Sequence, residues 1–121
     1  LEKSKDMIES MKELLKDKIS DVVISNRLKN YPVCLSSKGN LSIEMEKTLN
    51  SIPTDNNVKA EKVLELNDKS KMFDNLKNYF ENDKEKFNKL ASVLYNQALL
   101  IEGLSVQDPI EFTNNISDLL S

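Results

Sequence analysis

The chain has 121 residues, 39% of them hydrophobic, which is the length and composition of one domain with a modest core. Its 16 lysines and one arginine alternate with 20 acidic residues for a net charge of -3, so no face collects the basic stripe that nucleic acid requires. No apolar run reaches the ~18 residues of a membrane span, so no membrane contact is expected either.

The first half of the chain is predicted to mix helices and strands. Met7, Met11 and Leu15 recur at helical spacing, whereas short apolar runs on either side of the Tyr31-Pro32 break are typical of strands. The predicted elements are, in order, a helix over 5–18, strands over 21–28 and 33–37, a helix over 41–51 and a strand over 62–66.

The second half is predicted to be helical throughout, with helices over 71–81, 85–102 and 108 to the end. Gly103 stands where a left-handed residue would end the second of these helices. Asp108-Pro109, followed by Glu111, is a start signal for the third, with an N-cap and a proline at the first helical position. The fold class is therefore α+β, a small three-stranded sheet with about five helices in one domain over 1–121.

The helix over 85–102 is apolar around most of its circumference. Phe87, Leu90, Ala91, Leu94, Ala98 and Ile101 form an ordinary core stripe, but Tyr95, Leu99, Val93 and Leu100 extend it on both flanks. Two interpretations remain open at this point. The second face is covered either by the rest of the same chain or by a second chain.

The last helix also carries an apolar stripe, and the sequence given ends at Ser121 with no further segment to cover it. Two neighbouring helices with surplus apolar surface suit a homodimer in which four helices meet across a two-fold axis. The helix over 41–51 is ambiguous in the same way. Its stripe of Leu41, Met45 and Leu49 fits either a core face or an exposed contact surface, and Ile43 lies on the opposite side.

Catalytic chemistry is not expected in this chain. There is no histidine, which removes the commonest general base and metal ligand. The single cysteine, Cys34, lies in an apolar strand and is interpreted as a buried structural thiol. Two glycines cannot supply a phosphate-binding loop. We therefore predict no enzyme activity, no metal and no cofactor in these residues, and one cysteine suits a reducing cytoplasm.

Six short stretches resemble, in order, the C-terminal domain of the heat-shock protein 90 family, with its bacterial type the nearest match. These stretches are Val23-Ile24-Ser25-Asn26-Arg27-Leu28, Pro32-Val33-Cys34-Leu35, Leu41-Ser42-Ile43-Glu44-Met45-Glu46-Lys47, Leu64-Glu65-Leu66-Asn67, Leu94-Tyr95-Asn96-Gln97-Ala98-Leu99-Leu100 and Asp108-Pro109 with Phe112. The chain begins with Leu1 inside a charged helical pattern, so we expect a fragment of a longer ATP-dependent chaperone.

The resemblance implies specific roles. The last two helices would form the four-helix bundle of a homodimer, with interface residues Tyr95, Ala98, Leu99, Leu100, Phe112, Ile116, Leu119 and Leu120. A projecting amphipathic helix would contact unfolded client proteins through Leu41, Met45 and Leu49. ATP and magnesium would bind in the N-terminal part of the parent protein, outside this chain.

Three departures from the family pattern matter. Asn115 stands where the last helix often carries an arginine, and Asp68 stands where a proline is common. The chain also ends without the acidic tail through which eukaryotic members recruit co-chaperones, so no such partner is expected. The alternative hypothesis is a helical adaptor domain that binds one specific partner protein and has no chaperone role.

Overall fold

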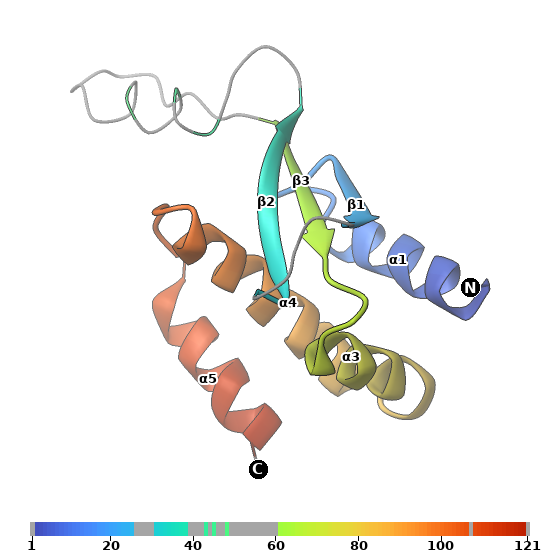
Figure 1. The fold of residues 1–121 in the computed structure, drawn as a ribbon. Helices are drawn as coiled ribbons and strands as arrows, with labels where there is room; N and C mark the ends of the chain where they lie inside the picture. Colours follow the sequence, from blue (N-terminus) through green and yellow to red (C-terminus); the bar gives the residue numbers. More distant parts are fainter. Residues whose placement is uncertain are drawn as a thin grey trace.

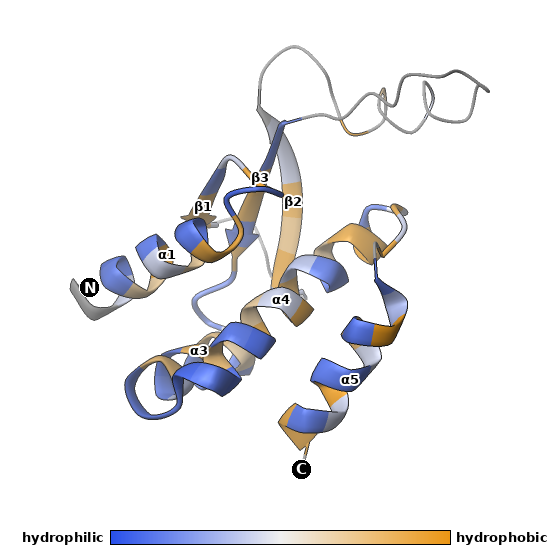
Figure 2. Cartoon of the chain, turned by 180° about the vertical axis from the view of Figure 1, so that it is seen from behind, coloured by the Kyte–Doolittle hydropathy of each residue, from blue (hydrophilic) through white to orange (hydrophobic). Residues whose placement is uncertain are grey.

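The structure is a computed structural model that describes residues 2–25, 31–38, 43, 45, 48, 61–106 and 108–120. Its elements are α1 (Glu2–Leu14), β1 (Asp21–Ile24), β2 (Val33–Lys38), β3 (Glu61–Leu66), α3 (Lys71–Asn82), α4 (Lys84–Ile101) and α5 (Pro109–Leu120). The α+β prediction is confirmed. Helix α4 runs through the middle of the molecule, with α1 on one side of it and α5 on the other (Figures 1 and 2).

The three strands form one mixed sheet in the order β1-β3-β2, with β1 parallel and β2 antiparallel to the central strand. Leu64 of β3 pairs with Val22 on one side and Leu35 on the other. All three side chains are buried, so this row faces the core. The predicted strands over 33–37 and 62–66 are confirmed to within a residue at each end. The first strand ends at Ile24 rather than residue 28, and residues 26–30 lie outside the described part of the chain.

Helix α1 ends at Leu14, four residues before the predicted end. The amides of Lys18 and Ile19 both donate to the carbonyl of Leu15, at 2.8 and 3.0 Å, and close the chain into a turn. The amide of Ser20 then donates to the carbonyl of Lys62 in β3, at 2.7 Å. Pairing with the central strand therefore replaces the last predicted helical turn.

The predicted helix over 41–51 lies mostly outside the described residues. Ile43, Met45 and Thr48 are described, and all three are helical. Four helices have described bounds, against the five that were predicted. The predicted helices over 71–81 and 85–102 agree with α3 and α4 to within one residue at each end. The last helix was predicted to begin at residue 108, and α5 begins at Pro109.

The core lies between the sheet and the helices α1, α3 and α4. Its largest fully buried side chains are Phe87, Met7, Met11, Leu64, Leu66, Leu76, Leu94 and Val33. These come from all three helices and two of the strands, and α4 packs directly on β2, α3 and α5. In Figure 2 the outward positions of α1 and α3 are hydrophilic, whereas apolar positions recur at the C-terminal end of α4 and along α5.

Local hydrogen bonds pair backbone amide and carbonyl groups at the ends of α3, α4 and α5. The side chains of Ser70, Asp83 and Asp108 each accept a bond from a first-turn amide, at 3.2, 3.2 and 3.0 Å. At the end of α4, Gly103 has a φ of 79°. The amide of Leu104 donates to the carbonyl of Leu99 at 2.8 Å, and that of Gly103 donates to Leu100 at 3.0 Å. This pair of bonds is a Schellman motif, which confirms the predicted helix stop.

Replacing Gly103 with alanine should lower the free energy of unfolding by about 1–2 kcal/mol, because a Cβ atom is disfavoured at positive φ. Urea denaturation of the purified chain measures this change. The matched control is Ser105→Ala, two residues away at an exposed position, which should change stability by less than about 0.5 kcal/mol. Equal effects of the two substitutions would show that the left-handed conformation of Gly103 is not required.

Candidate functional site

The candidate site is the α4–α5 hairpin, residues 84–120, whose first helix has no charged side chain from Leu90 to Ile101. Phe87, Ala91, Leu94 and Ala98 are buried on the core side of α4. Tyr95 and Leu99 are buried on its flank, where the ammonium group of Lys18 lies 5.8 Å from the centre of the Tyr95 ring. Each face of this uncharged stretch is therefore covered, for most of its length, by other parts of the same chain.

The second face of α4 is covered by α5, which answers the question left open by the sequence. Val93 and Asn96 are buried on the side of α4 that α5 packs against. Tyr95, Ala98 and Leu99, predicted as interface residues, are also covered within their own chain, so covering them does not require a second chain. Periodicity identifies apolar faces but not which element packs on each, so their place in a dimer interface stays a prediction.

The other five predicted interface residues are wholly or partly accessible. Phe112, Ile116 and Leu119 are half-buried against α4, whereas Leu100 and Leu120 are 51% and 82% exposed. The structure adds two residues that sequence reasoning missed, Ile101 and Ile110, which are 41% and 74% exposed. Ile110 directly follows the Asp108-Pro109 helix start, so helix numbering from that cap could have found it. Leu100, Ile101, Ile110 and Leu120 together are the exposed apolar set of the hairpin.

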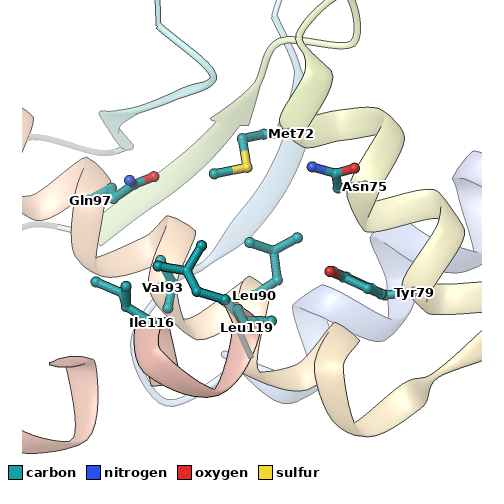
Figure 3. A pocket seen from close by; sticks show the side chains of 9 residues that line it. Met72, Asn75, Tyr79, Leu90, Val93, Gln97, Ile116 and Leu119 are labelled. Atoms are coloured by element: carbon teal, nitrogen blue, oxygen red, sulfur yellow. The ribbon is translucent and has the colours of Figure 1, made fainter. Parts of the chain in front are cut away.

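A groove of about 200 Å³ lies where α3, α4 and α5 meet. Its lining residues are Met72, Asn75, Tyr79, Leu90, Val93, Gln97, Ile116, Leu119 and Leu120. In Figure 3 the side chains of Met72, Val93 and Leu119 converge on its centre, with Gln97 toward one end and Tyr79 toward the other. The buried Oε1 atom of Gln97 has no hydrogen-bond partner. The groove is thus apolar with a polar end.

An ion pair joins the two helices of the hairpin. The Nζ atom of Lys89 lies 2.9 Å from Oδ2 of Asp118 on α5, and 3.6 Å from Oε1 of Glu85 one turn earlier on α4. The hydrogen bond to Asp118 is the main reason that the pKa of Lys89 is raised above 10.5. A raised lysine pKa means that the pair is fully formed at neutral pH and that its stabilisation is lost only as the pH rises through that higher value.

The predicted client-contact helix can be assessed at two positions. Met45 is 49% exposed, whereas Ile43 is buried, with 6% of its surface accessible. Helical spacing predicted that these two residues lie on opposite sides of one helix. In the structure, Met45 lies on the accessible side. Leu41 and Leu49 lie outside the described residues.

Comparison with known proteins identifies the family. The family model described as Hsp90 protein matches residues 1–121. The chain belongs to the Hsp90 family. It is 57% identical over 119 residues to chaperone protein HtpG of Clostridium perfringens ATCC 13124, 56% identical over 118 residues to chaperone protein HtpG of Bacillus subtilis 168, and 53% identical over 119 residues to that of Clostridium acetobutylicum. Each alignment covers 98% of this chain but 19% of the relative, so the chain spans about a fifth of these proteins.

Three further features of this Hsp90-family chain concern its cysteine, metal ligands and helix lengths. Cys34 is buried and forms no disulfide, as its place in an apolar strand predicted. Within the described residues, no group of three or more Cys, Asp or Glu side chains could hold a metal ion. Nor does any described helix have the length and apolar character needed to cross a membrane.

Adjacent leucines on α4 provide a test of this arrangement. Leu99→Ala should lower the free energy of unfolding by about 2–5 kcal/mol, because a buried side chain is truncated and leaves a cavity. Leu100→Ala removes the same atoms from an exposed position and should change it by less than about 0.5 kcal/mol. Thermal and urea denaturation should be measured at a protein concentration where the chain is monomeric. A larger effect at Leu100 than at Leu99 would contradict the assigned orientation of α4.

Proposed function

We propose that this chain is the homodimerisation and client-contact domain of a cytoplasmic, HtpG-type chaperone of the Hsp90 family. The observation that carries the proposal is the exposed apolar set of the α4–α5 hairpin, in a chain that matches the family along its whole length. An HtpG-type protein would use the parts outside this chain to bind and hydrolyse ATP with magnesium. The residues described in this structure would then supply assembly and contact rather than chemistry.

Dimerisation is supported by the shape and surface of the hairpin. Two antiparallel helices from each of two copies make a four-helix bundle when they meet across a two-fold axis. Leu100 and Ile101 end α4 and Ile110 begins α5, so three of the four exposed apolar residues lie near the connection between the helices. A second hairpin packed there would remove these side chains from water, at about 25 cal/mol for each Å² of apolar surface buried.

The mechanical role of such a domain follows from holding two protomers together. A permanent link at one end converts an encounter between the two distant ATP-binding domains into an intramolecular event at a high effective concentration. The domain would therefore contribute to an ATP-driven cycle without binding the nucleotide. Client contact would use the outer side of the helix that contains Met45, because a half-exposed, flexible methionine suits a surface that accepts varied apolar partners.

The first test is the oligomeric state of the purified chain. At ~100 μM it should sediment as a dimer, because a standard interface of about 1,200–2,000 Å² commonly gives affinities far tighter than that concentration. Leu100→Ala combined with Leu120→Ala should weaken the dimer by about three orders of magnitude or more. Two-fold symmetry repeats each truncation, and each costs roughly 1–2 kcal/mol.

The control for this pair is Val23→Ala. Val23 is 36% exposed on β1 and is not part of the hairpin, so its truncation should leave the dimer intact. Half-buried Ile116 is not used, because its truncation would also loosen α5 within its own chain. A wild-type chain that sediments as a monomer would contradict the dimer proposal and favour the adaptor hypothesis.

A second test uses two residues of the proposed client-contact helix. Met45→Ser should change folding stability by less than about 0.5 kcal/mol, because the side chain is half-exposed. In the full-length chaperone, it should nevertheless reduce protection of an unfolded client from aggregation. Ile43→Ser, on the buried side, should instead cost about 2–5 kcal/mol of folding stability. A large drop in melting temperature for Met45→Ser would place Met45 in the core and remove the contact assignment.

A further inference from the structure

Helix α5 is held by the domain less firmly than α4 is. It packs on α4, and among its side chains Asn115 alone is buried, compared with nine on α4. The apolar side chains nearest to α4, Phe112, Ile116 and Leu119, are only half-buried, and those of Ile110 and Leu120 project into solvent. Elements with few buried apolar contacts open locally before the rest of a domain unfolds.

The face of α4 beneath α5 tolerates exposure to water. It presents Lys89, Val93 and Asn96, which recur at helical spacing, in contrast with the wholly apolar core face of the same helix. The Nδ2 atom of Asn96 donates to the carbonyl of Ser92 at 3.0 Å, so the amide is satisfied within α4 itself. Departure of α5 would therefore expose two buried apolar side chains, Leu90 and Val93, and leave this amide with its partner.

Both helix ends at the connection are capped without help from the other helix. The Schellman motif at Gly103 closes α4, and the side chain of Asp108 closes α5 through the amide of Glu111. Neither cap uses the packing between α4 and α5. Helix α5 can thus separate from α4 as an intact helix.

The ion pair between the helices has a second acid within reach. Lys89 lies 2.9 Å from Asp118 and 3.6 Å from Glu85, and Glu85 belongs to α4 itself. When α5 leaves, the ammonium group loses Asp118 but keeps Glu85, so opening does not strand its charge. Both acids contact the ammonium group while α5 is docked, because an ammonium group has three N–H donors.

We propose that α5 is a strap that opens from α4 as a rigid helix, with Lys89–Asp118 as its latch and Glu85 as the partner that keeps the ammonium group when the latch opens. Opening removes the Ile116 and Leu119 wall of the groove and uncovers Leu90 and Val93. The effect of this opening on assembly rests on the proposed dimerisation. A second copy would recognise the closed hairpin, so the fraction of closed α5 would tune assembly.

Hydrogen exchange measured by mass spectrometry on the 121-residue chain tests the strap. At a dilution where the chain is monomeric, α5 amides should exchange at least about tenfold faster than those of β3 and the centre of α4. Asp118→Asn should speed α5 exchange by about two- to fivefold, the range typical of a single exposed ion pair. Glu85→Gln should leave that exchange unchanged or slow it, because the open state loses the acid that would still pair with Lys89.

The matched control is Glu13→Gln, which breaks the surface ion pair between Glu13 of α1 and Lys16 and should leave α5 exchange unchanged. Equal exchange of α5 and β3 in the wild-type chain, or faster α5 exchange in Glu85→Gln than in Asp118→Asn, would overturn the strap. Raising the concentration into the dimeric range should slow α5 exchange. If α5 exchange stays the same at high concentration although the variants behave as expected, the proposed dimerisation is wrong and the strap still holds.

Discussion

The fold depends on one helix that cannot face water. Between Leu90 and Ile101, α4 carries twelve consecutive residues without a charge, in a chain that is 31% charged overall. Each large apolar side chain that leaves water there contributes about 1.5–3 kcal/mol, so a stable arrangement has to cover α4 on several sides. The sheet, α1, α3 and α5 each cover part of it, and the order of elements along the chain makes this possible. The first half supplies the sheet and α1, and the helices on either side of α4 in sequence fold back on it.

This arrangement uses most of the apolar residues for folding and few for contact. Tyr95, Ala98 and Leu99 belong to the core of their own chain, although the sequence alone made them equally plausible at an interface. Within the hairpin, the apolar side chains that remain accessible lie at the C-terminal end of α4 and on α5. A domain that folds by itself can assemble only through surface left over from its core. The exposed set is therefore more informative about assembly than the total apolar content of either helix.

Much of the fold could be predicted from local sequence signals, because these signals act within a few residues. Asp108-Pro109 and Gly103 fixed the ends of α4 and α5, and the short apolar runs located all three strands. The strand order and the partner of each helix face could not be predicted in the same way. Both depend on residues far apart in sequence, such as the pairing of Val22 with Leu64 and the packing of α5 over Val93. The premature end of α1 has the same cause, since the bond from Ser20 to Lys62 spans 42 positions.

The candidate site was harder to predict than the fold because its residues are defined by exposure. Helical spacing placed Ile43 and Met45 on opposite sides of one helix, but only the structure distinguished the buried side from the accessible one. The same limit applies to Leu99 and Leu100, which are adjacent and chemically identical and differ only in what surrounds them. Lys89 shows how a contact can stabilise the docked position of α5 and still be lost at low cost. Its ammonium group stabilises α5 through Asp118, yet Glu85 one turn away on α4 reduces the cost of losing that contact. A helix attached mainly through half-buried side chains and an ion pair of this kind can be ordered in the folded domain and still be the first element to move.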